Sequence, residues 1–438
     1  MRQQQITART LGVCLIFLTL FIANSALAEQ KSTDKTYKQL EVFATSLSIL
    51  EQNYIQPLDP EKSLTDAISG ILQGLDPHSS YLSAKEFHDL QSETSGSFSG
   101  IGIEVSTRNN NLTIIAPLDG SPAAQAGIEA QDQIIEINGK KTAEMSSQQA
   151  LMLLRGPIGS SISLSLKREG EENLLHISLI RERISLQSVS FLPLGRDIFY
   201  SRITSFQSNT SHDYVEKLNR IKKKREIRGL ILDLRNNPGG LLSQAISISD
   251  LFISSGAIVH TRGRAAEQNM TFEARDLGED NDFPMLVLIN GGSASASEIV
   301  AGALQDQGRA IIVGTDSFGK GSVQTIIPLP NGAALKITTA QYYTPKNRSI
   351  QAQGIHPDIT LSRLKKGSSC RESADQSTEA SLTNHLDNPN GKAKRAPRSA
   401  REKKVQKLLA DDNQIRVARD ILRGILRYSA YQDAQVGE

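Results

Sequence analysis

The spacing of apolar residues divides the chain into a helical beginning, a β-rich middle and an alternating α/β second half. Between residues 29 and 95, leucine, isoleucine and phenylalanine recur every three or four positions, which predicts amphipathic helices. Asp76-Pro77 ends the second of them, because proline disfavours helical backbone at the preceding residue. Such stripes are typical of core packing or of contacts between helices.

Short apolar runs separated by turn residues follow. The predicted strands cover residues 111–117, 133–138 and 161–168. Asn138-Gly139 predicts a tight turn. One helix is predicted at 146–155, with its apolar residues on one face. We therefore expect a small β-rich module over residues 96–184.

The segment from 185 to 365 alternates strands and helices. Residues 230–234 and 285–289 are continuous apolar runs, which is typical of strands buried on both faces of a parallel sheet. Helical spacing follows each strand, at 245–252 and at 297–304. The fold predicted for the whole chain is therefore an α/β multidomain protein.

The last region, residues 366–438, changes in composition partway along. Up to about residue 402 it is rich in Ser, Asn, Lys and Arg, which predicts a solvated linker. A single amphipathic helix is predicted at 402–428. Its apolar stripe must pack on its own domain or on another subunit. Self-association through the terminal helices and packing within one chain both explain this pattern.

The first 28 residues have the composition of an export signal. Arg2 and Arg9 flank a short basic region, and residues 11–22 after it form an apolar run. That run is too short for the roughly 20 residues of a spanning helix. Ala26-Leu27-Ala28 supplies the small residues that a signal peptidase reads, so we predict cleavage after Ala28 and export, with the bacterial periplasm as destination.

Composition excludes several classes of partner. The chain has 49 basic and 47 acidic residues, which indicates no polyanionic partner. It has no Trp and only 5% aromatics, so nucleic acid is not an expected ligand. Cys14 leaves with the signal segment and Cys370 then has no partner for an internal disulfide. No H-E-x-x-H motif or cysteine pair predicts a metal, and no cofactor is expected.

Candidate chemistry lies in three glycine-rich segments that follow predicted strands. They are DLRNNPGG at 233–240, NGGSASASE at 290–298 and GTDSFGKGSVQ at 314–324. In an α/β sheet, functional groups gather at the carboxyl ends of the strands. Three such loops can therefore meet at one site.

The middle loop places Ser293, Ser295 and Ser297 before a helix, where backbone N–H groups favour a developing oxyanion. Serines there are commonly helix caps, and Ser297 with Glu298 fits a cap best. Lys320 lies between two glycines in the third loop. Such a lysine is usually a solvated cation, but burial lowers its pKa and makes it a candidate general base. No G-x-S-x-G elbow is present, and a Ser–Lys pair needs no histidine.

Two other motifs overlap this third loop. Residues 314–320 match G-x-x-x-x-G-K, but Gly321 stands where a phosphate-binding loop needs Ser or Thr, and a strand is predicted at 322–328. Ser317 and Lys320 form S-x-x-K, but the S-D-N and K-T-G motifs that accompany it in penicillin-binding enzymes are missing.

With these motifs in order, the chain resembles the carboxyl-terminal processing proteases, or tail-specific proteases, which are Ser-Lys serine peptidases with an inserted PDZ domain. The resemblance covers about residues 35–365. It rests on the strand and turn at 230–240, S-A-S-A-S-E at 293–298 and F-G-K-G-S-V-Q at 318–324. It implies Ser295 as nucleophile and Lys320 as general base.

The resemblance also implies supporting roles. Gln324 would orient Lys320, and the oxyanion hole would be formed by backbone N–H groups of Ala296 and of Gly240 or the adjacent Gly239. Asp306 matches an acidic position near the site, where an ordinary ion-pair role explains it equally well.

The β-rich module then resembles a PDZ domain, which binds a peptide C-terminus as an added strand. Its carboxylate-binding loop would be Gly100-Ile101-Gly102-Ile103. The side chains expected to line an apolar pocket are those of Ile101, Ile103, Leu151 and Leu154. Arg155, at the end of the PDZ helix, is either a contact between domains or a solvated cation.

The function predicted from sequence is an exported serine endopeptidase that recognises protein substrates with accessible apolar C-termini. It would be gated by its PDZ domain or by an activating partner protein. The alternative is a non-catalytic PDZ scaffold on a protease-like fold. The predicted regions are 1–28 signal peptide, 29–95 helical, 96–184 PDZ, 185–365 protease core and 366–438 linker and helix.

Overall fold

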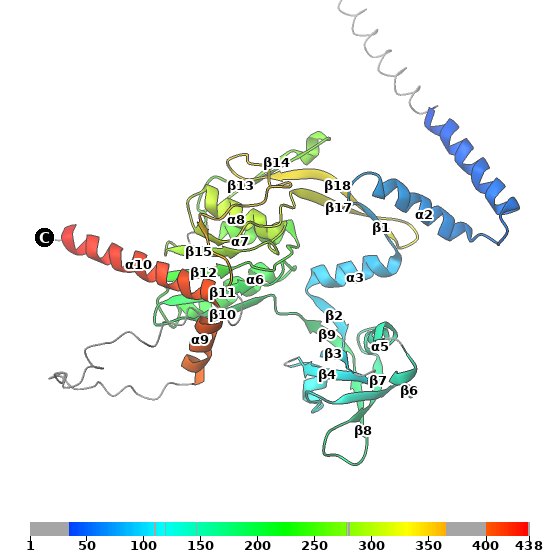
Figure 1. The fold of residues 1–438 in the computed structure, drawn as a ribbon, viewed down its shortest axis with the longest axis horizontal. Coiled ribbons are helices and arrows are strands. Elements are labelled where there is room, and N and C mark those ends of the chain that lie inside the picture. The colour runs from blue at the N-terminus through cyan, green and yellow to red at the C-terminus, as the bar shows by residue number, and fades with distance from the viewer. Residues whose placement is uncertain are drawn as a thin grey trace, which may run out of the picture. The chain divides into compact units, whose positions relative to one another are not determined.

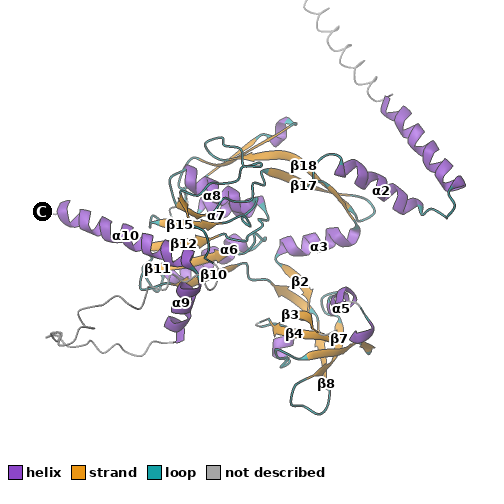
Figure 2. Ribbon diagram, viewed as in Figure 1, coloured by secondary structure: helices purple, strands orange, loops and turns teal. Residues whose placement is uncertain are grey.

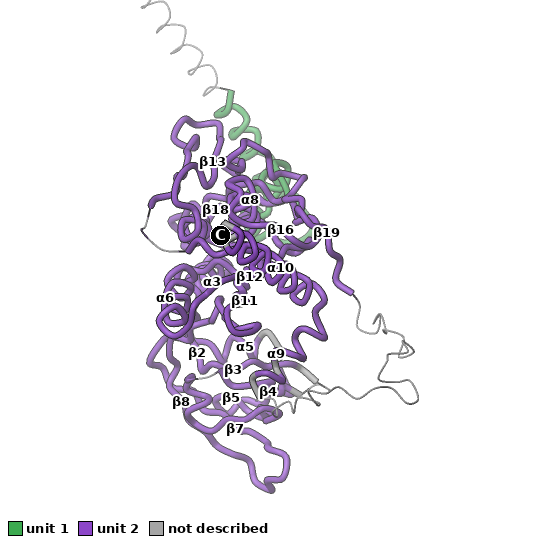
Figure 3. The backbone as a smooth tube through the Cα atoms, turned by 90° about the vertical axis from the view of Figure 1, so that its left-hand side faces the viewer, with its two compact units in different colours: residues 1–77 green, residues 78–438 purple. Residues whose placement is uncertain are grey.

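The computed structural model describes residues 35–108, 111–118, 120–145, 147–276, 278, 281–364 and 400–436. The predicted signal peptide, Cys370 and most of the predicted linker lie outside the described residues. The chain divides into two compact units, residues 1–77 and 78–438 (Figure 3). Within the described ranges, no helix has the length and apolar character needed to cross a membrane.

Unit 1 is helical, as the apolar spacing predicts. Residues 35–53 form a helix, and α2 follows at Pro60–Gln73 (Figure 1). Asp59 caps α2, since its carboxylate accepts the backbone N–H groups of Glu61 and Lys62. Both helices expose large apolar side chains, among them Leu40, Phe43, Leu64, Ile68 and Ile71.

Unit 2 begins with a short strand that the sequence analysis missed. β1 (Ser80–Leu82) pairs antiparallel with β18 (Ala334–Tyr343) of the protease core. α3 (Ala84–Ser95) follows, opened by a capping box between Ser83 and Glu86. β1 therefore interrupts the helical region predicted for residues 29–95, and α3 completes it. A strand of three residues is too short to show an alternating apolar pattern. It is defined by its pairing with β18.

The PDZ module is an antiparallel sheet with a helix against it (Figure 2). Its strands are β3 (Ile103–Arg108), β4 (Asn111–Pro117), β5 (Gln133–Ile137), β6 (Lys140–Lys141), β7 (Ser161–Lys167) and β8 (Leu175–Ile180). Its helices are α4 (Pro122–Gln125), η1 (Thr142–Glu144) and α5 (Ser147–Leu154). The predicted turn is confirmed by positive φ angles at Asn138 and Gly139. β2 (Ser97–Gly100) pairs with β9 (Glu182–Ser185), so the module starts and ends at one two-stranded ribbon.

The protease core is built on a six-stranded sheet. In spatial order its strands are β10 (Val189–Pro193), β11 (Ile198–Ile203), β12 (Gly229–Asp233), β15 (Met285–Ile289), β16 (Ile311–Gly314) and β19 (Ile359–Thr360). Only the β10–β11 pair is antiparallel. Helices α6 (Thr210–Lys222), α7 (Leu242–Asp250) and α8 (Ala296–Asp306) pack against one face through a core that includes Leu230 and Leu232. The predicted strands and helices of the core are confirmed.

A second sheet lies beside the first in the same unit. β18 pairs with β1 and with β13 (Ala257–Gly263) along one edge and with β17 (Ser322–Pro328) along the other. β14 (Met270–Glu273) extends β13, and η2 (Ala266–Gln268) connects the two. The strand predicted after Lys320 is therefore β17.

The single helix predicted at 402–428 is wrong, because two helices are present. α9 (Ala400–Asp411) and α10 (Asn413–Val436) meet at Asp412, whose carboxylate accepts the backbone N–H groups of Gln414 and Ile415. An N-cap aspartate restarts the helix without interrupting the apolar stripe, so periodicity alone hides the break. Both helices pack on the face of the main sheet opposite α6–α8, against Ile231, Leu286 and Leu288.

A buried ionic cluster fastens this helical pair to the end of β12. Arg235, 5% exposed, donates to Asp233 and Asp412 with N–O distances of 2.7 and 3.0 Å, and to Gln414 at 2.6 Å. Arg202 also pairs with Asp233, at 3.0 Å. Burial opposes ionisation of Asp233, but hydrogen bonds and charge from the two arginines hold its pKa below the ordinary value. The cluster therefore links the C-terminal helices to the loop that follows β12.

Candidate active site

Three loops meet at the carboxyl ends of the adjacent strands β12, β15 and β16. The Asn236 N–H donates to the Asn290 side chain at 2.9 Å, which joins the first loop to the second. The Phe318 N–H donates to the Ser293 carbonyl at 3.0 Å, which joins the third loop to the second. The structure therefore brings together the three segments that the sequence analysis selected.

The three serines of the middle loop have different surroundings. Ser293 Oγ donates to the Leu234 carbonyl at 2.8 Å, and Ser297 Oγ donates to the Asn237 carbonyl at 2.9 Å. Both side chains are fully buried and fasten the middle loop to the first one. Ser295 is partly exposed. Geometry therefore distinguishes Ser295 from its neighbours, which residue spacing did not.

Ser295 occupies a strained backbone position directly before α8. Its φ of 54° lies where a residue with a side chain rarely occurs. Gly239 lies against it: a Cβ at Gly239 would be 2.9 Å from Ser295 Cβ and 3.0 Å from the Ala296 nitrogen. The Gly239 N–H is already bonded to Asn237 Oδ1 at 2.9 Å. Of the two glycines, this favours Gly240 as an oxyanion donor beside Ala296.

Lys320 has the electrostatics of a candidate base. Partial burial lowers its pKa, the positive charge of Lys336 lowers it further, and Glu298 acts in the opposite direction. In the part of the chain that the structure describes, no hydrogen bond of 3.5 Å or less joins Lys320 Nζ to Ser295 Oγ. Catalytic hydrogen bonds are often long before substrate binds, so this separation leaves a catalytic role open.

Gln324 lies on β17 and is not bonded to Lys320 here. Its side-chain amide donates to Ser322 Oγ at 2.9 Å and to Thr338 Oγ1 at 3.3 Å. That Gln324 orients Lys320 stays a prediction. It requires an arrangement of the Gln324 side chain other than the one in this structure.

Glu298 is the residue whose importance the sequence analysis missed. Its carboxylate is fully buried and accepts from the Ser295 N–H at 2.8 Å and the Lys320 N–H at 2.9 Å. It also accepts from the Gly319 N–H and from Ser317 Oγ, both at 2.6 Å. The predicted cap of Ser297 with Glu298 is wrong, because Ser295 is the N-cap residue of α8 and Ser297 lies inside the helix. The link of Glu298 to a loop some twenty residues away depends on tertiary packing, which the sequence does not show.

The PDZ side chains predicted to line a pocket are divided between interior and surface. Ile101 and Leu154 are 1% and 5% exposed and belong to the PDZ core, so neither lines an open groove in this structure. Leu154 faces inward because it shares a helix face with the buried Ala150. Ile103 is partly buried and Leu151 is 43% exposed, and for these two the groove role stays a prediction.

Arg155 and Asp306 both take part in ion pairs. Arg155 reaches Asp89 of α3 at 3.5 Å, so it contacts a segment outside the PDZ sheet. Asp306, at the C-terminal end of α8, pairs with Arg348 and accepts the Lys346 N–H at 2.9 Å. Burial opposes its ionisation, but these bonds hold the pKa of Asp306 below its ordinary value. Asp306 thus fastens the turn after β18.

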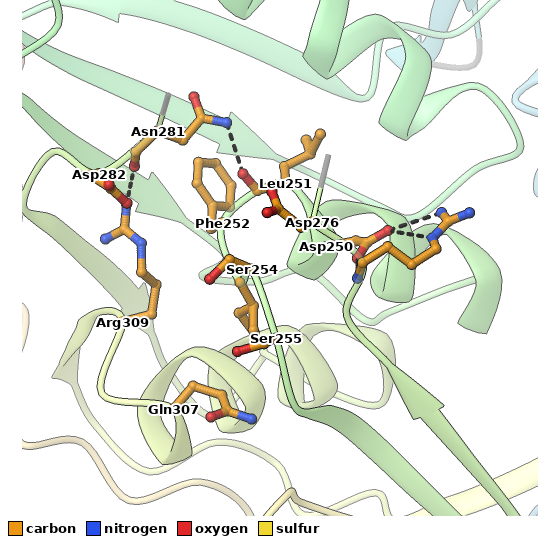
Figure 4. A pocket seen from close by; sticks show the side chains of 12 residues that line it. Asp250, Leu251, Phe252, Ser254, Ser255, Asp276, Asn281, Asp282, Gln307 and Arg309 are labelled. Carbon is orange, nitrogen blue, oxygen red and sulfur yellow. Dashed lines mark hydrogen bonds and ion pairs between the residues drawn. The ribbon is translucent and has the colours of Figure 1, made fainter. Parts of the chain in front are cut away.

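A polar cavity of about 220 Å³ lies at the same end of α8 (Figure 4). It is lined partly by the Asp250–Arg275 ion pair and by Arg309. Because α8 has 11 residues, this cavity is about 16 Å along the helix from Ser295. It contains none of the predicted site residues. No group of three potential metal-binding side chains occurs among the described residues.

The fold and site define the class of protein. The family model for Peptidase family S41 matches residues 197–361, and that for the PDZ domain matches residues 113–168. A carboxy-terminal-processing protease of Bartonella bacilliformis is 41% identical over 434 residues, covering 96% of each chain. The carboxy-terminal processing protease CtpA of Bacillus subtilis is 35% identical over 346 residues, or 78% of this chain and 73% of that one.

A solved photosystem II D1 C-terminal processing protease is 30% identical, with a TM-score of 0.44, and the match covers 73% of this chain and 86% of that one. The chain belongs to the carboxyl-terminal processing proteases of peptidase family S41, with a PDZ domain. The family resemblance and the α/β multidomain fold are thereby confirmed.

Proposed function

We propose that this carboxyl-terminal processing protease is an exported serine endopeptidase in which Ser295 is the nucleophile and Lys320 the general base. The observation that carries the proposal is the pairing of a strained, partly exposed serine with a lysine of lowered pKa on the neighbouring strand-end loop. A strained backbone at a helix N-terminus is typical of activated nucleophiles. A depressed lysine pKa supplies the neutral amine that a base needs.

The reaction proceeds through an acyl-enzyme. Neutral Lys320 takes the proton of the Ser295 hydroxyl while the oxygen attacks the scissile carbonyl. The resulting ammonium gives that proton to the leaving amine, which breaks the peptide bond. Lys320 then takes a proton from water, the hydroxide attacks the acyl-enzyme, and Ser295 recovers its proton. The backbone N–H groups of Ala296 and Gly240 hold the oxyanion in both halves.

Substrate selection belongs to the PDZ domain. PDZ domains bind a C-terminus by adding it as a strand and by holding its carboxylate with backbone N–H groups. Gly102, at a φ of 74°, allows the backbone of the Gly100–Ile103 loop to turn where a side chain would meet Ser121. Protein substrates with accessible apolar C-termini fit this arrangement. The absence of a hydrogen bond between Ser295 Oγ and Lys320 Nζ, both of which the structure describes, supports a resting site that is aligned by the PDZ domain or by a partner protein.

The test uses Ser295→Ala with Ser293→Ala and Ser297→Ala as matched controls. Each variant is incubated with an unfolded protein that ends in apolar residues, and cleavage and the acyl-enzyme are followed by mass spectrometry. We expect Ser295→Ala to lose both signals and each control variant to keep acylation. Peptide binding without cleavage by the wild-type protein, with or without a cellular extract, would instead support the PDZ scaffold.

Export has a separate test. Expression of the full chain in a bacterium, followed by fractionation and N-terminal sequencing, is expected to give a periplasmic protein that begins at Glu29. An uncleaved protein in the cytoplasm would contradict the proposal.

A further inference from the structure

Glu298 is a fully buried carboxylate at the point where the nucleophile loop and the base loop meet. Burying a carboxylate is costly unless hydrogen bonds replace its hydration. Here each oxygen has two donors. Oε2 accepts from the Ser295 and Lys320 N–H groups, and Oε1 accepts from the Gly319 N–H and Ser317 Oγ. All four lone-pair positions are therefore used.

The two donors on Oε2 are the backbone nitrogens of the proposed nucleophile and the proposed base. They lie 2.8 and 2.9 Å from the same oxygen, so they are no further apart than the sum of those distances. The side chains of Ser295 and Lys320 are not bonded to each other, yet their backbones are held on one atom. Glu298 therefore fixes the backbones of Ser295 and Lys320 relative to each other at these two nitrogens.

We propose that Glu298 is a positioning residue that holds Ser295 and Lys320 in fixed register by binding both backbones through one carboxylate oxygen. The proposal rests on the Ser–Lys function proposed above. Its chemistry requires an ionised carboxylate, because no other side chain of this size accepts on two oxygens from four donors. A glutamine would direct its NH₂ group at two of those donors.

Glu298 also acts on Lys320 through its charge. Burial and two charges set the pKa of Lys320: burial and Lys336 of β18 favour the neutral amine, and Glu298 of α8 favours the ammonium. Removing the carboxylate charge therefore makes Lys320 easier to deprotonate. Removing a donor from the carboxylate has the opposite effect, because a less neutralised Glu298 attracts the ammonium more strongly.

The test compares Glu298→Gln and Ser317→Ala by the pH dependence of kcat on an unfolded protein substrate. The rate is expected to rise with pH as Lys320 loses its proton. For Glu298→Gln we expect kcat to fall about 100-fold, since a misplacement of about 1 Å costs that much, with KM unchanged and the midpoint at lower pH. For Ser317→Ala we expect the midpoint to move to higher pH.

Glu298→Asp separates the effect of the carboxylate charge from the effect of side-chain length. It keeps the charge but shortens the side chain by one methylene, so we expect a reduced kcat with the midpoint near that of wild type. Thermal unfolding of each full-length variant verifies that the protease core around Glu298 is folded. If Glu298→Gln does not fold, Ser317→Ala decides, and an unchanged or lowered midpoint then overturns the proposal.

The proposal is likewise overturned if Glu298→Gln folds and keeps the wild-type midpoint or the wild-type kcat. Failure of the underlying function has a different signature. Lys320→Ala would then keep the alkaline rise in rate, or Ser295→Ala would keep activity, whatever Glu298 variants do.

Discussion

Replacing Asp412 with asparagine tests the cluster that fastens the C-terminal helices to β12. Asparagine is also a good N-cap, so the hydrogen bonds to the Gln414 and Ile415 N–H groups can persist. What disappears is the negative charge that lies 3.0 Å from Arg235, in a pair whose side chains are 6% and 8% exposed. The change therefore isolates the buried charge from the cap.

The expected cost follows from burial. Breaking a buried ion pair by removing one partner costs roughly 3–5 kcal/mol. Because Asp233 and Gln414 still bind Arg235, we expect the lower end, about 3 kcal/mol. For a core of this size that corresponds to a Tm lowered by roughly 6–12 °C. Raised salt should change the effect little, since buried pairs are poorly screened.

The assay is thermal unfolding of the full-length protein together with hydrogen exchange of the α10 amides. Asp420→Asn is the matched control on the same helix. Asp420 pairs with Arg419 while 52% exposed, so its loss should cost less than about 1 kcal/mol. If Asp412→Asn and Asp420→Asn unfold alike, or if α10 exchanges no faster in Asp412→Asn, the cluster does not hold the helices and the reasoning is refuted.

Three further outcomes are expected. Gly239→Ala should lower kcat at least about 100-fold, because its Cβ would lie 2.8 Å from the Ala294 carbonyl and displace the oxyanion segment; wild-type kcat would contradict this. Lys320→Met should abolish cleavage and should flatten the dependence of the free energy of unfolding on pH. The folded pKa of Lys320 lies below 10.5, so wild-type stability rises with pH between the folded and unfolded pKa values, which unfolding at several pH values measures. Asp306→Asn should lower stability at neutral pH by about 2 kcal/mol, a difference that shrinks as pH falls through the lowered folded pKa of Asp306.

The local sequence pattern was sufficient to predict elements whose own residue types indicate burial or a turn. The fully apolar run at 285–289 is β15, and the Asn138-Gly139 turn has the backbone that its residues favour. Pattern failed at β1 and at Asp412. A three-residue strand is defined by a partner far away in the chain, and a cap inside an apolar stripe leaves the periodicity intact.

The candidate site shows the same division. The expectation that the three strand-end glycine loops meet is confirmed, because the topology of an α/β sheet decides where loops gather. Sequence spacing gave no reason to prefer Ser295 as the nucleophile, since all three serines precede or open the predicted helix within five residues of one another. The distinction comes from hydrogen bonds of Ser293 and Ser297 to the loop after β12. The role of Glu298 is equally a property of packing between distant segments.

The pairing of β1 with β18 has a consequence for synthesis of the protein. Ser80 pairs with Lys336, and the whole PDZ module is translated between the two strands. Contacts between residues so distant in the chain slow folding, because the loop must close before the contact forms. The nascent chain therefore cannot complete this sheet until the strand containing Lys336 has left the ribosome. We expect proteolytic activity to appear late, after translation is nearly complete, and chains that stop before residue 334 to leave β1 without its partner.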